Sequence, residues 1–265
     1  MSRAEEYGCY FAAEVGVDIK FGVNAFDEFE VFAELCGIPA TVVPLEGDFT
    51  IDPEKYHGLD RFIVIANPNA PTGLCLTLDE IEAIVQSNPD GVVVIDEAYV
   101  DFGAESAVKL VDKYENLLVT QTFSKSRSLA GARLGFGIGN KDLIADLHTV
   151  RYSTNPYNVN RMTMAAGCAA LADNDYYMQN CRTIMENRTF TTAALREIGF
   201  EVLDSKANFI FATYPGVCGA ALYSCLKEKG ILVRHFGSER IKEYIRITIG
   251  TKEQMDALKK AMEAI

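Results

Sequence analysis

The chain has 265 residues, of which 49% are hydrophobic and 23% charged, a composition typical of a soluble globular protein with one large or two modest domains. Its 25 basic and 37 acidic side chains give a net charge of −12, which argues against nucleic acids and anionic membrane surfaces as main partners. It contains no apolar run of the roughly 20 residues that a membrane span needs, no secretory signal and no C-x-x-C pair among its seven cysteines, so we expect a reduced cytoplasmic protein.

The first half of the chain alternates short runs rich in Val and Ile with segments of helical period. We expect strands at 41–44, 61–66, 91–96, 117–122 and 134–139. We expect helices at 26–36, 78–87 and 141–152. The run 92–95 is apolar on both faces, as in a buried parallel strand. This alternation predicts an α/β domain with a mostly parallel sheet that helices cover.

The pattern changes from about residue 156. Two long helical segments follow, at 159–172 and 176–198, the second with Asn187 and Arg188 on its polar side. After them we expect, in order, a strand at 208–212, a helix at 220–229, strands at 231–234 and 244–249, and a helix at 252–262. This order predicts a smaller α+β domain. We therefore divide the chain into an atypical N-terminal segment (1–19), a large domain (20–155) and a small domain (156–265).

Two polar segments directly follow apolar strands, at the sheet edge where ligands bind in open α/β folds. The first is a stiff loop from Asn67 to Gly73 with two prolines, in which the Ala70–Pro71 bond is a candidate cis peptide. In the second, Asp96 ends the most apolar strand and Tyr99 follows three residues later. A carboxylate at that point requires a cation or hydrogen-bond donors, such as a protonated cofactor ring nitrogen, or else it caps a helix.

A third segment, 122–133, follows another buried strand and is rich in hydroxyl and basic groups. Thr122 and Ser124 precede Lys125, and Arg133 comes eight residues after the lysine. Hydroxyls and a guanidinium together can bind a phosphate, and a lysine of lowered pKa can form a Schiff base. The alternative is a solvated basic loop.

The fourth segment is an alternating apolar strand that Arg246 interrupts, and Arg234 closes the neighbouring predicted strand in the same way. An arginine in such a strand either extends to solvent or contacts a buried anion. The three histidines, in contrast, lie far apart in the sequence, so we predict no metal site.

In this order the four segments resemble those of the fold-type I pyridoxal-phosphate aminotransferases of class I and II, and most closely the histidinol-phosphate aminotransferases. The segments 33–39 (A-E-L-C-G-I-P) and 207–209 (A-N-F) and the spacing of Arg234 and Arg246 add to the resemblance, which covers about residue 20 to the C-terminus. It implies a mostly parallel large-domain sheet with helices on both faces, a smaller C-terminal α+β domain, and a homodimer.

The resemblance also implies roles for individual residues. Lys125 forms the Schiff base with pyridoxal 5′-phosphate and moves the proton, Asp96 pairs with the pyridine nitrogen, and Tyr99 hydrogen-bonds the phenolic oxygen. It further implies that Phe26 stacks on the cofactor ring and that Asn69 contacts the phenolic oxygen. The implied phosphate-binding residues are Thr122, Ser124 and Arg133. For the substrate, the resemblance implies that Arg246 binds the carboxylate, Asn208 lines the carboxylate site and Arg234 binds the phosphate.

The chain departs from the family pattern in two places. Ala70 stands where the family has an asparagine before Pro-Thr-Gly, so Asn69 is the residue expected to replace it. Nothing in 1–22 resembles the N-terminal arm, first strand and glycine-rich phosphate loop of the family. We therefore expect the chain to begin partway through the large domain.

These observations predict a transaminase that converts histidinol phosphate and 2-oxoglutarate into imidazole-acetol phosphate and glutamate. Its partners are small amino acids and 2-oxo acids, not nucleic acids or membranes. Three alternatives stay open at this point: an aromatic aminotransferase, a decarboxylase of threonine phosphate, and a non-catalytic remnant that binds the cofactor weakly.

Overall fold

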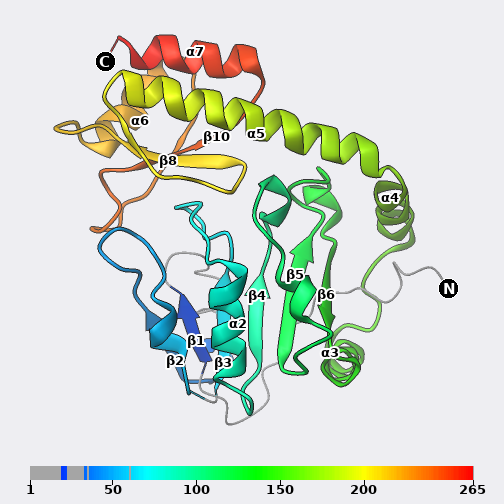
Figure 1. Ribbon diagram of the computed structural model, residues 1–265. Coiled ribbons are helices and arrows are strands. Elements are labelled where there is room, and N and C mark those ends of the chain that lie inside the picture. Colours follow the sequence, from blue (N-terminus) through cyan, green and yellow to red (C-terminus); the bar gives the residue numbers. More distant parts are fainter. Residues whose placement is uncertain (1–18, 23–32, 35, 60, 265) are drawn as a thin grey trace.

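The computed structural model describes residues 19–22, 33–34, 36–59 and 61–264 (Figure 1). Its larger sheet has six strands in the order β2-β1-β3-β4-β5-β6. They are β1 (Ile19–Gly22), β2 (Ala40–Val43), β3 (Phe62–Ala66), β4 (Val93–Asp96), β5 (Leu117–Thr122) and β6 (Gly135–Gly139). All pairings are parallel except that of β5 with β6, which confirms the mostly parallel sheet.

Helices cover both faces of this sheet because its central strands are apolar on both sides. Helix α2 (Leu78–Gln86) begins at a capping box, in which Thr77 and Glu80 satisfy each other's backbone amides, and buries its apolar stripe on one face. Helix α3 (Lys141–Thr154) packs on the opposite face, against Val94 and Leu118. The short 3₁₀ helices η2 (Pro53–Tyr56) and η4 (Ala107–Leu110) complete the core on the α2 side.

The second sheet is antiparallel, with four strands in the order β7-β8-β10-β9. They are β7 (Glu201–Val202), β8 (Phe209–Thr213), β9 (Arg234–His235) and β10 (Ile245–Thr248). The helices of this half are α4 (Arg161–Ala172), α5 (Asn174–Glu197), α6 (Gly219–Glu228) and α7 (Lys252–Met262). Helix α5 runs above both sheets in Figure 1 and contacts the 3₁₀ helix η3 (Val100–Phe102) of the larger one.

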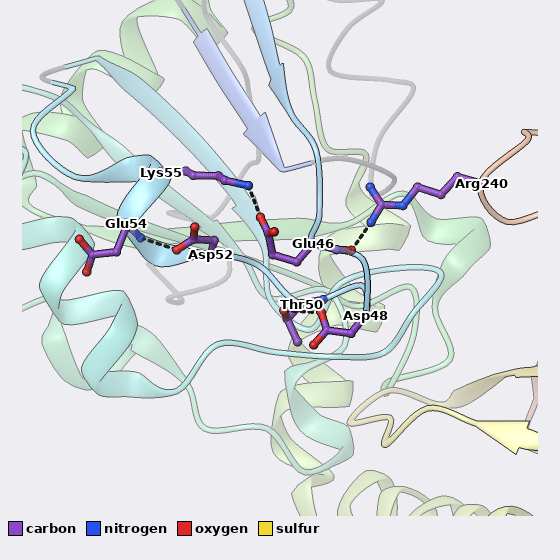
Figure 2. Close-up of polar contacts among 7 residues, drawn as sticks. All are labelled: Glu46, Asp48, Thr50, Asp52, Glu54, Lys55 and Arg240. Atoms are coloured by element: carbon purple, nitrogen blue, oxygen red, sulfur yellow. Dashed lines mark hydrogen bonds and ion pairs between the residues drawn. The ribbon is translucent and has the colours of Figure 1, made fainter.

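A polar turn after β2 joins the two halves of the molecule (Figure 2). Asp48 accepts hydrogen bonds from the amide (3.0 Å) and hydroxyl (2.7 Å) of Thr50, which closes the turn. Arg240, from the connection between β9 and β10, donates to the carbonyl oxygen of Glu46, whose carboxylate pairs with Lys55. The turn therefore links the large sheet to the small one through Arg240. Lys55 holds the turn to its own half of the molecule.

Phe49, at the tip of this turn, is an apolar wedge between the sheets. Its φ is +69°, a left-handed conformation that side chains larger than glycine adopt rarely. The ring packs edge-on against Phe211 (6.0 Å between centroids) and Tyr244 (5.2 Å), both from the small sheet. Burial of this ring, which is 6% exposed, compensates for the backbone conformation.

Most of the predicted elements are present, and their ends agree within a few residues. The strand predicted at 231–234 is wrong in its bounds: β9 begins only at Arg234, because Arg234 and His235 are the residues that pair with β10. Strands β1 and β7 and the 3₁₀ helices were not predicted. The helix expected at 26–36 falls largely outside the described residues, which include only its residues 33, 34 and 36.

The two sheets lie on either side of residue 155, where we expect the boundary between domains, and the division into domains stays a prediction. The N-terminal segment 1–19, apart from residue 19, lies outside the described residues. No described helix combines the length and the apolar character that crossing a bilayer requires.

Candidate functional site

Three loops meet where the parallel strands β3, β4 and β5 end. The Asn67 amide donates to the carbonyl of Asp96 (2.9 Å), and the Glu97 amide donates to the carbonyl of Thr120 (2.8 Å). These bonds continue the sheet by one residue beyond its regular pairing. They bring the loop 67–73, the segment 96–99 and the segment after Thr122 to one edge, as the sequence predicts.

Asp96 is the last residue of β4, paired with Ala66 of β3 on one side and with Thr120 of β5 on the other. Its side chain accepts a hydrogen bond from the Ala98 amide (3.1 Å), so it does cap the turn that follows. Burial raises the pKa of Asp96 to about 6, although the Ala98 amide and the Thr120 hydroxyl act in the opposite direction. A carboxylate so placed gains from a cationic partner, and a protonated ring nitrogen fits this position.

Tyr99 and Lys125 lie together beside Asp96. The Lys125 amine lies 5.2 Å from the centre of the Tyr99 ring, and the positive charge of Lys125 acts on Asp96. Lys125 is exposed, whereas its neighbour Ser126 is buried and donates a hydrogen bond to Asp101. Asp101 belongs to η3, so this bond ties the lysine segment to the segment that carries Tyr99.

The predicted phosphate-binding residues lie on the turn between β5 and β6. The Thr122 hydroxyl accepts from the Ser124 amide (3.1 Å) and donates to the Leu134 carbonyl (3.3 Å). Arg133 is left-handed (φ +53°) after the 3₁₀ helix η5 (Ala130–Ala132), and its guanidinium donates to the Ala130 carbonyl (3.3 Å). Thr122 is thus partly engaged in holding the turn, whereas the Ser124 and Arg133 side chains remain available to an anion.

Helix α4 supports this turn from outside. The Thr163 hydroxyl donates to the Ala132 carbonyl (3.3 Å), and the Arg127 guanidinium donates to the Ala170 carbonyl (2.8 Å). A Cβ at Gly167 would come within 2.5 Å of Leu134, so only glycine allows the helix to approach this closely. Helix α4 therefore helps to fix the turn that carries Arg133.

The loop 67–73 has the predicted cis peptide at Ala70–Pro71 and a second one at Asn67–Pro68. The side chain of Asn67 accepts from the Leu76 amide (2.7 Å) and donates to the Leu76 carbonyl (3.3 Å). Asn69 is buried, and its side-chain oxygen accepts from the Thr72 hydroxyl (2.9 Å). Asn67 is thus a structural residue, and the role of Asn69 toward the cofactor stays a prediction.

Arg246 and Arg234 face each other across the pair β10 and β9. The Nε atom of Arg246 is buried and has no hydrogen-bond partner among the described residues. Burial lowers the pKa of the Arg246 guanidinium, Tyr99 raises it, and Arg234 lowers it further. Two like charges in direct opposition destabilise a strand pair unless an anion lies between them, so this arrangement indicates an anion site.

Asn208 precedes β8 at the same end of the small sheet. Its carbonyl oxygen accepts from the Ile249 amide (2.9 Å), which ties it to the strand of Arg246. Phe26 lies outside the described residues, so its predicted stacking on the cofactor ring stays a prediction. Of the histidine, cysteine and acidic side chains that the structure describes, no three or more are grouped as metal ligands would be.

Two charged residues, Glu97 and Arg188, support the site in ways that the sequence did not predict. Glu97 is 2% exposed and accepts hydrogen bonds from Ser106 (2.6 Å), the Ala107 amide (2.6 Å) and Gln121 (2.8 Å). Burial raises the pKa of Glu97, and these hydrogen bonds oppose that effect. Glu97 therefore anchors the segment 96–99, and the acidic run at 96–97 was the only sequence signal for it.

Asn187 and Arg188, predicted on the polar side of a helix, do lie on helix α5, and both are buried. Arg188 donates to the carbonyls of Phe102 (2.8 Å) and Ala207 (2.6 Å), and Asn187 donates to that of Gly250 (2.9 Å). The polar side of α5 binds backbone carbonyls of both halves of the molecule. Single-chain periodicity cannot distinguish such a face from a solvated one.

Comparison with known proteins gives the same family for the whole described chain. A family model described as aminotransferase class I and II matches residues 16–263. Histidinol-phosphate aminotransferase of Brachyspira hyodysenteriae is 52% identical over 242 residues, which are 91% of this chain and 68% of that protein. Histidinol-phosphate aminotransferase 1 of Pseudomonas fluorescens is 47% identical over 240 residues, 91% of this chain and 69% of that protein.

A solved structure agrees with the fold. Histidinol-phosphate aminotransferase from Sinorhizobium meliloti, in complex with pyridoxal-5′-phosphate, superposes with a TM-score of 0.82 at 24% identity, over 96% of this chain and 71% of that one. The predicted fold class is therefore confirmed. The chain spans about two thirds of the length of these relatives.

Proposed function

This chain belongs to the class I and II aminotransferases, and from that premise we propose that it transfers the amino group of histidinol phosphate to 2-oxoglutarate. The observation that carries the proposal is the pair Arg234 and Arg246: the unpartnered Nε of Arg246 is buried, and its guanidinium carbon lies 5.0 Å from the centre of the Phe209 ring, which packs on Tyr99. Several curated relatives at 46–52% identity are histidinol-phosphate aminotransferases, which supports this substrate over an aromatic amino acid.

The residues present fit pyridoxal phosphate, the cofactor of this family. Asp96 would pair with the ring nitrogen, because its buried carboxylate lacks a full counter-charge, and Tyr99 and Asn69 would contact the phenolic oxygen. Ser124, Arg133 and, in part, Thr122 would hold the phosphate. When bound, the cofactor supplies an electron sink for the charge that develops at the substrate Cα.

The chain's own groups supply binding and proton transfer. The Lys125 amine would hold the cofactor and, once the substrate amine has displaced it, would take the proton from the Cα of the amino donor and, in the other half of the reaction, deliver a proton to the Cα of the 2-oxo acid. Its contact with the Tyr99 ring restricts the directions in which the amine can point. Arg246 and Arg234 orient the anionic groups of the two substrates in turn, which holds the Cα within reach of the lysine.

The assignment of Lys125 is tested by adding pyridoxal phosphate to the purified chain and recording the visible spectrum. We expect a visible absorption band that borohydride abolishes and that is absent from the Lys125→Ala variant. Lys109→Ala is the matched control, since Lys109 is an exposed lysine paired with Glu105 on the surface. An equal band in Lys125→Ala, or none in the unaltered chain, contradicts the assignment.

We also propose that the protein is a homodimer in the cytoplasm. Large apolar side chains are exposed near the start of α4 and α5, among them Tyr157 (91%), Met162 (85%) and Tyr176 (65%). Burial of these side chains against a partner subunit would remove their apolar surface from water. Light scattering tests the dimer: a monomer at micromolar concentration contradicts it.

A further inference from the structure

A row of alternating cations and aromatic rings runs from the large sheet into the small one. The Lys125 amine lies 5.2 Å from the centre of the Tyr99 ring, and that ring meets Phe209 edge-on at 5.1 Å. On the far side of Phe209, the guanidinium carbon of Arg246 lies 5.0 Å from the ring centre. The catalytic and the substrate-binding residues proposed above are therefore joined through packed rings.

Phe236 continues this row and contacts both arginines. The centre of its ring lies 5.8 Å from the guanidinium carbon of Arg246 and 5.4 Å from that of Arg234. The ring also meets Phe211, at 6.3 Å, and so belongs to the apolar cluster around Phe49. Two cations thus share one aromatic ring whose own position is fixed from below.

This arrangement requires an explanation because the two arginines repel each other. They are directly opposed on β9 and β10, and no described carboxylate forms an ion pair with either of them within 4 Å. The negative face of an aromatic ring attracts a guanidinium, by an amount similar to the repulsion between two partly solvated charges. A ring placed between the arginines can therefore hold both in position before any anion binds.

We propose that Phe236 is a positioning residue that determines specificity: it holds the Arg234 and Arg246 guanidinium groups convergent and so selects a substrate with a doubly charged phosphate group. The inference rests on the proposed function. A single carboxylate uses one arginine fully, whereas a phosphate dianion uses both. Loss of the ring allows the two guanidinium groups to separate, so binding of the phosphate ligand weakens and binding of its counterpart without the phosphate does not.

The test uses the full chain and two ligands, histidinol phosphate and histidinol, which differ only in the phosphate. Calorimetric titration without added cofactor gives the two dissociation constants and their ratio for each variant, so the readout is independent of turnover. Phe236→Leu removes the ring, Phe236→Met removes it with less change of volume, and Phe236→Tyr retains it. Phe190→Leu is the matched control, because Phe190 also has a cation over its ring, Lys252 at 3.3 Å, but lies on α5 away from the arginines.

We expect the unaltered chain to prefer histidinol phosphate, and Phe236→Leu and Phe236→Met to lose roughly tenfold of that preference. Phe236→Tyr and Phe190→Leu should retain it within about twofold. Circular dichroism shows which of the Leu and Met variants folds. If the ratio of the two dissociation constants is unchanged in a folded variant, the inference is overturned while the proposed function stands. Equal affinity of the unaltered chain for both ligands overturns the proposed function and the inference with it.

Discussion

Replacement of Arg188 tests how the two halves of the molecule are held together. Arg188 is 9% exposed on α5, and its guanidinium donates to the carbonyl of Phe102, which follows the Asp96–Tyr99 segment, and to that of Ala207, next to Asn208. Burial lowers the pKa of Arg188. This one side chain therefore connects the segment proposed to bind the cofactor, the segment proposed to bind the substrate, and helix α5.

The effect of Arg188→Met follows from the two bonds. A hydrogen bond from a charged donor contributes about 1.5–3 kcal/mol, and each buried carbonyl left without a donor costs about 1–3 kcal/mol. The methionine recovers some of this loss, because it fills most of the space and avoids burial of a charge. We expect the free energy of unfolding to fall by about 3 kcal/mol.

The assay is equilibrium unfolding in urea, with Arg182→Met as the matched control. Arg182 lies on the same helix but is exposed, and among the described residues its guanidinium donates only to the Gln179 side chain, at 3.1 Å. We expect this control to change the free energy of unfolding by less than about 0.5 kcal/mol. A loss below about 1 kcal/mol in Arg188→Met, or an equal loss in both variants, refutes the reasoning.

Two further predictions concern the loop 67–73 and Asp96. Gly73 has a φ of +78°, and a Cβ there would overlap the Ser205 side chain, so Gly73→Ala should lower the free energy of unfolding by about 2–4 kcal/mol in thermal unfolding. Gly58→Ala, where φ is +63° and space is free, should lower it by about 1 kcal/mol, and equal losses in the two variants contradict this. Without cofactor, the pKa of Asp96 is raised from 3.8 to about 6 in the folded protein. Between pH 3.8 and about 6 the folded protein therefore binds more protons than the unfolded chain, and it loses stability as the pH rises through this range. Asp96→Asn should therefore match the unaltered chain near pH 4 and be more stable by about 2–3 kcal/mol at pH 7 in urea unfolding; a stability difference that does not vary with pH contradicts this.

The central strands and the site residues that follow them were predictable because their signals are local. An apolar run such as 92–95 has no other stable place than the middle of a sheet, and a carboxylate at its end must have a partner. Asp96, Tyr99, Lys125 and Arg133 could therefore be named from the sequence, and the structure brings them to one edge.

The residues that support the site depend on contacts between distant parts of the chain. Arg188 is buried where Phe102 and Ala207 approach α5 from the two halves of the molecule, and Phe236 contacts both arginines because β9 and β10 pair Arg234 with Arg246. The two-residue strand β7 has too few residues to show a period. These features follow from tertiary packing, which local patterns do not encode.

The central claim, that the chain transfers the amino group of histidinol phosphate, is tested most directly by a single half-reaction. The chain is loaded with pyridoxal phosphate, freed of excess cofactor, and mixed with histidinol phosphate or with phenylalanine in the absence of a 2-oxo acid. We predict that histidinol phosphate abolishes the visible band of the bound cofactor, that 2-oxoglutarate restores it, and that phenylalanine at the same concentration acts at least about tenfold more slowly. A band that histidinol phosphate leaves unchanged, or that phenylalanine abolishes equally fast, contradicts the account.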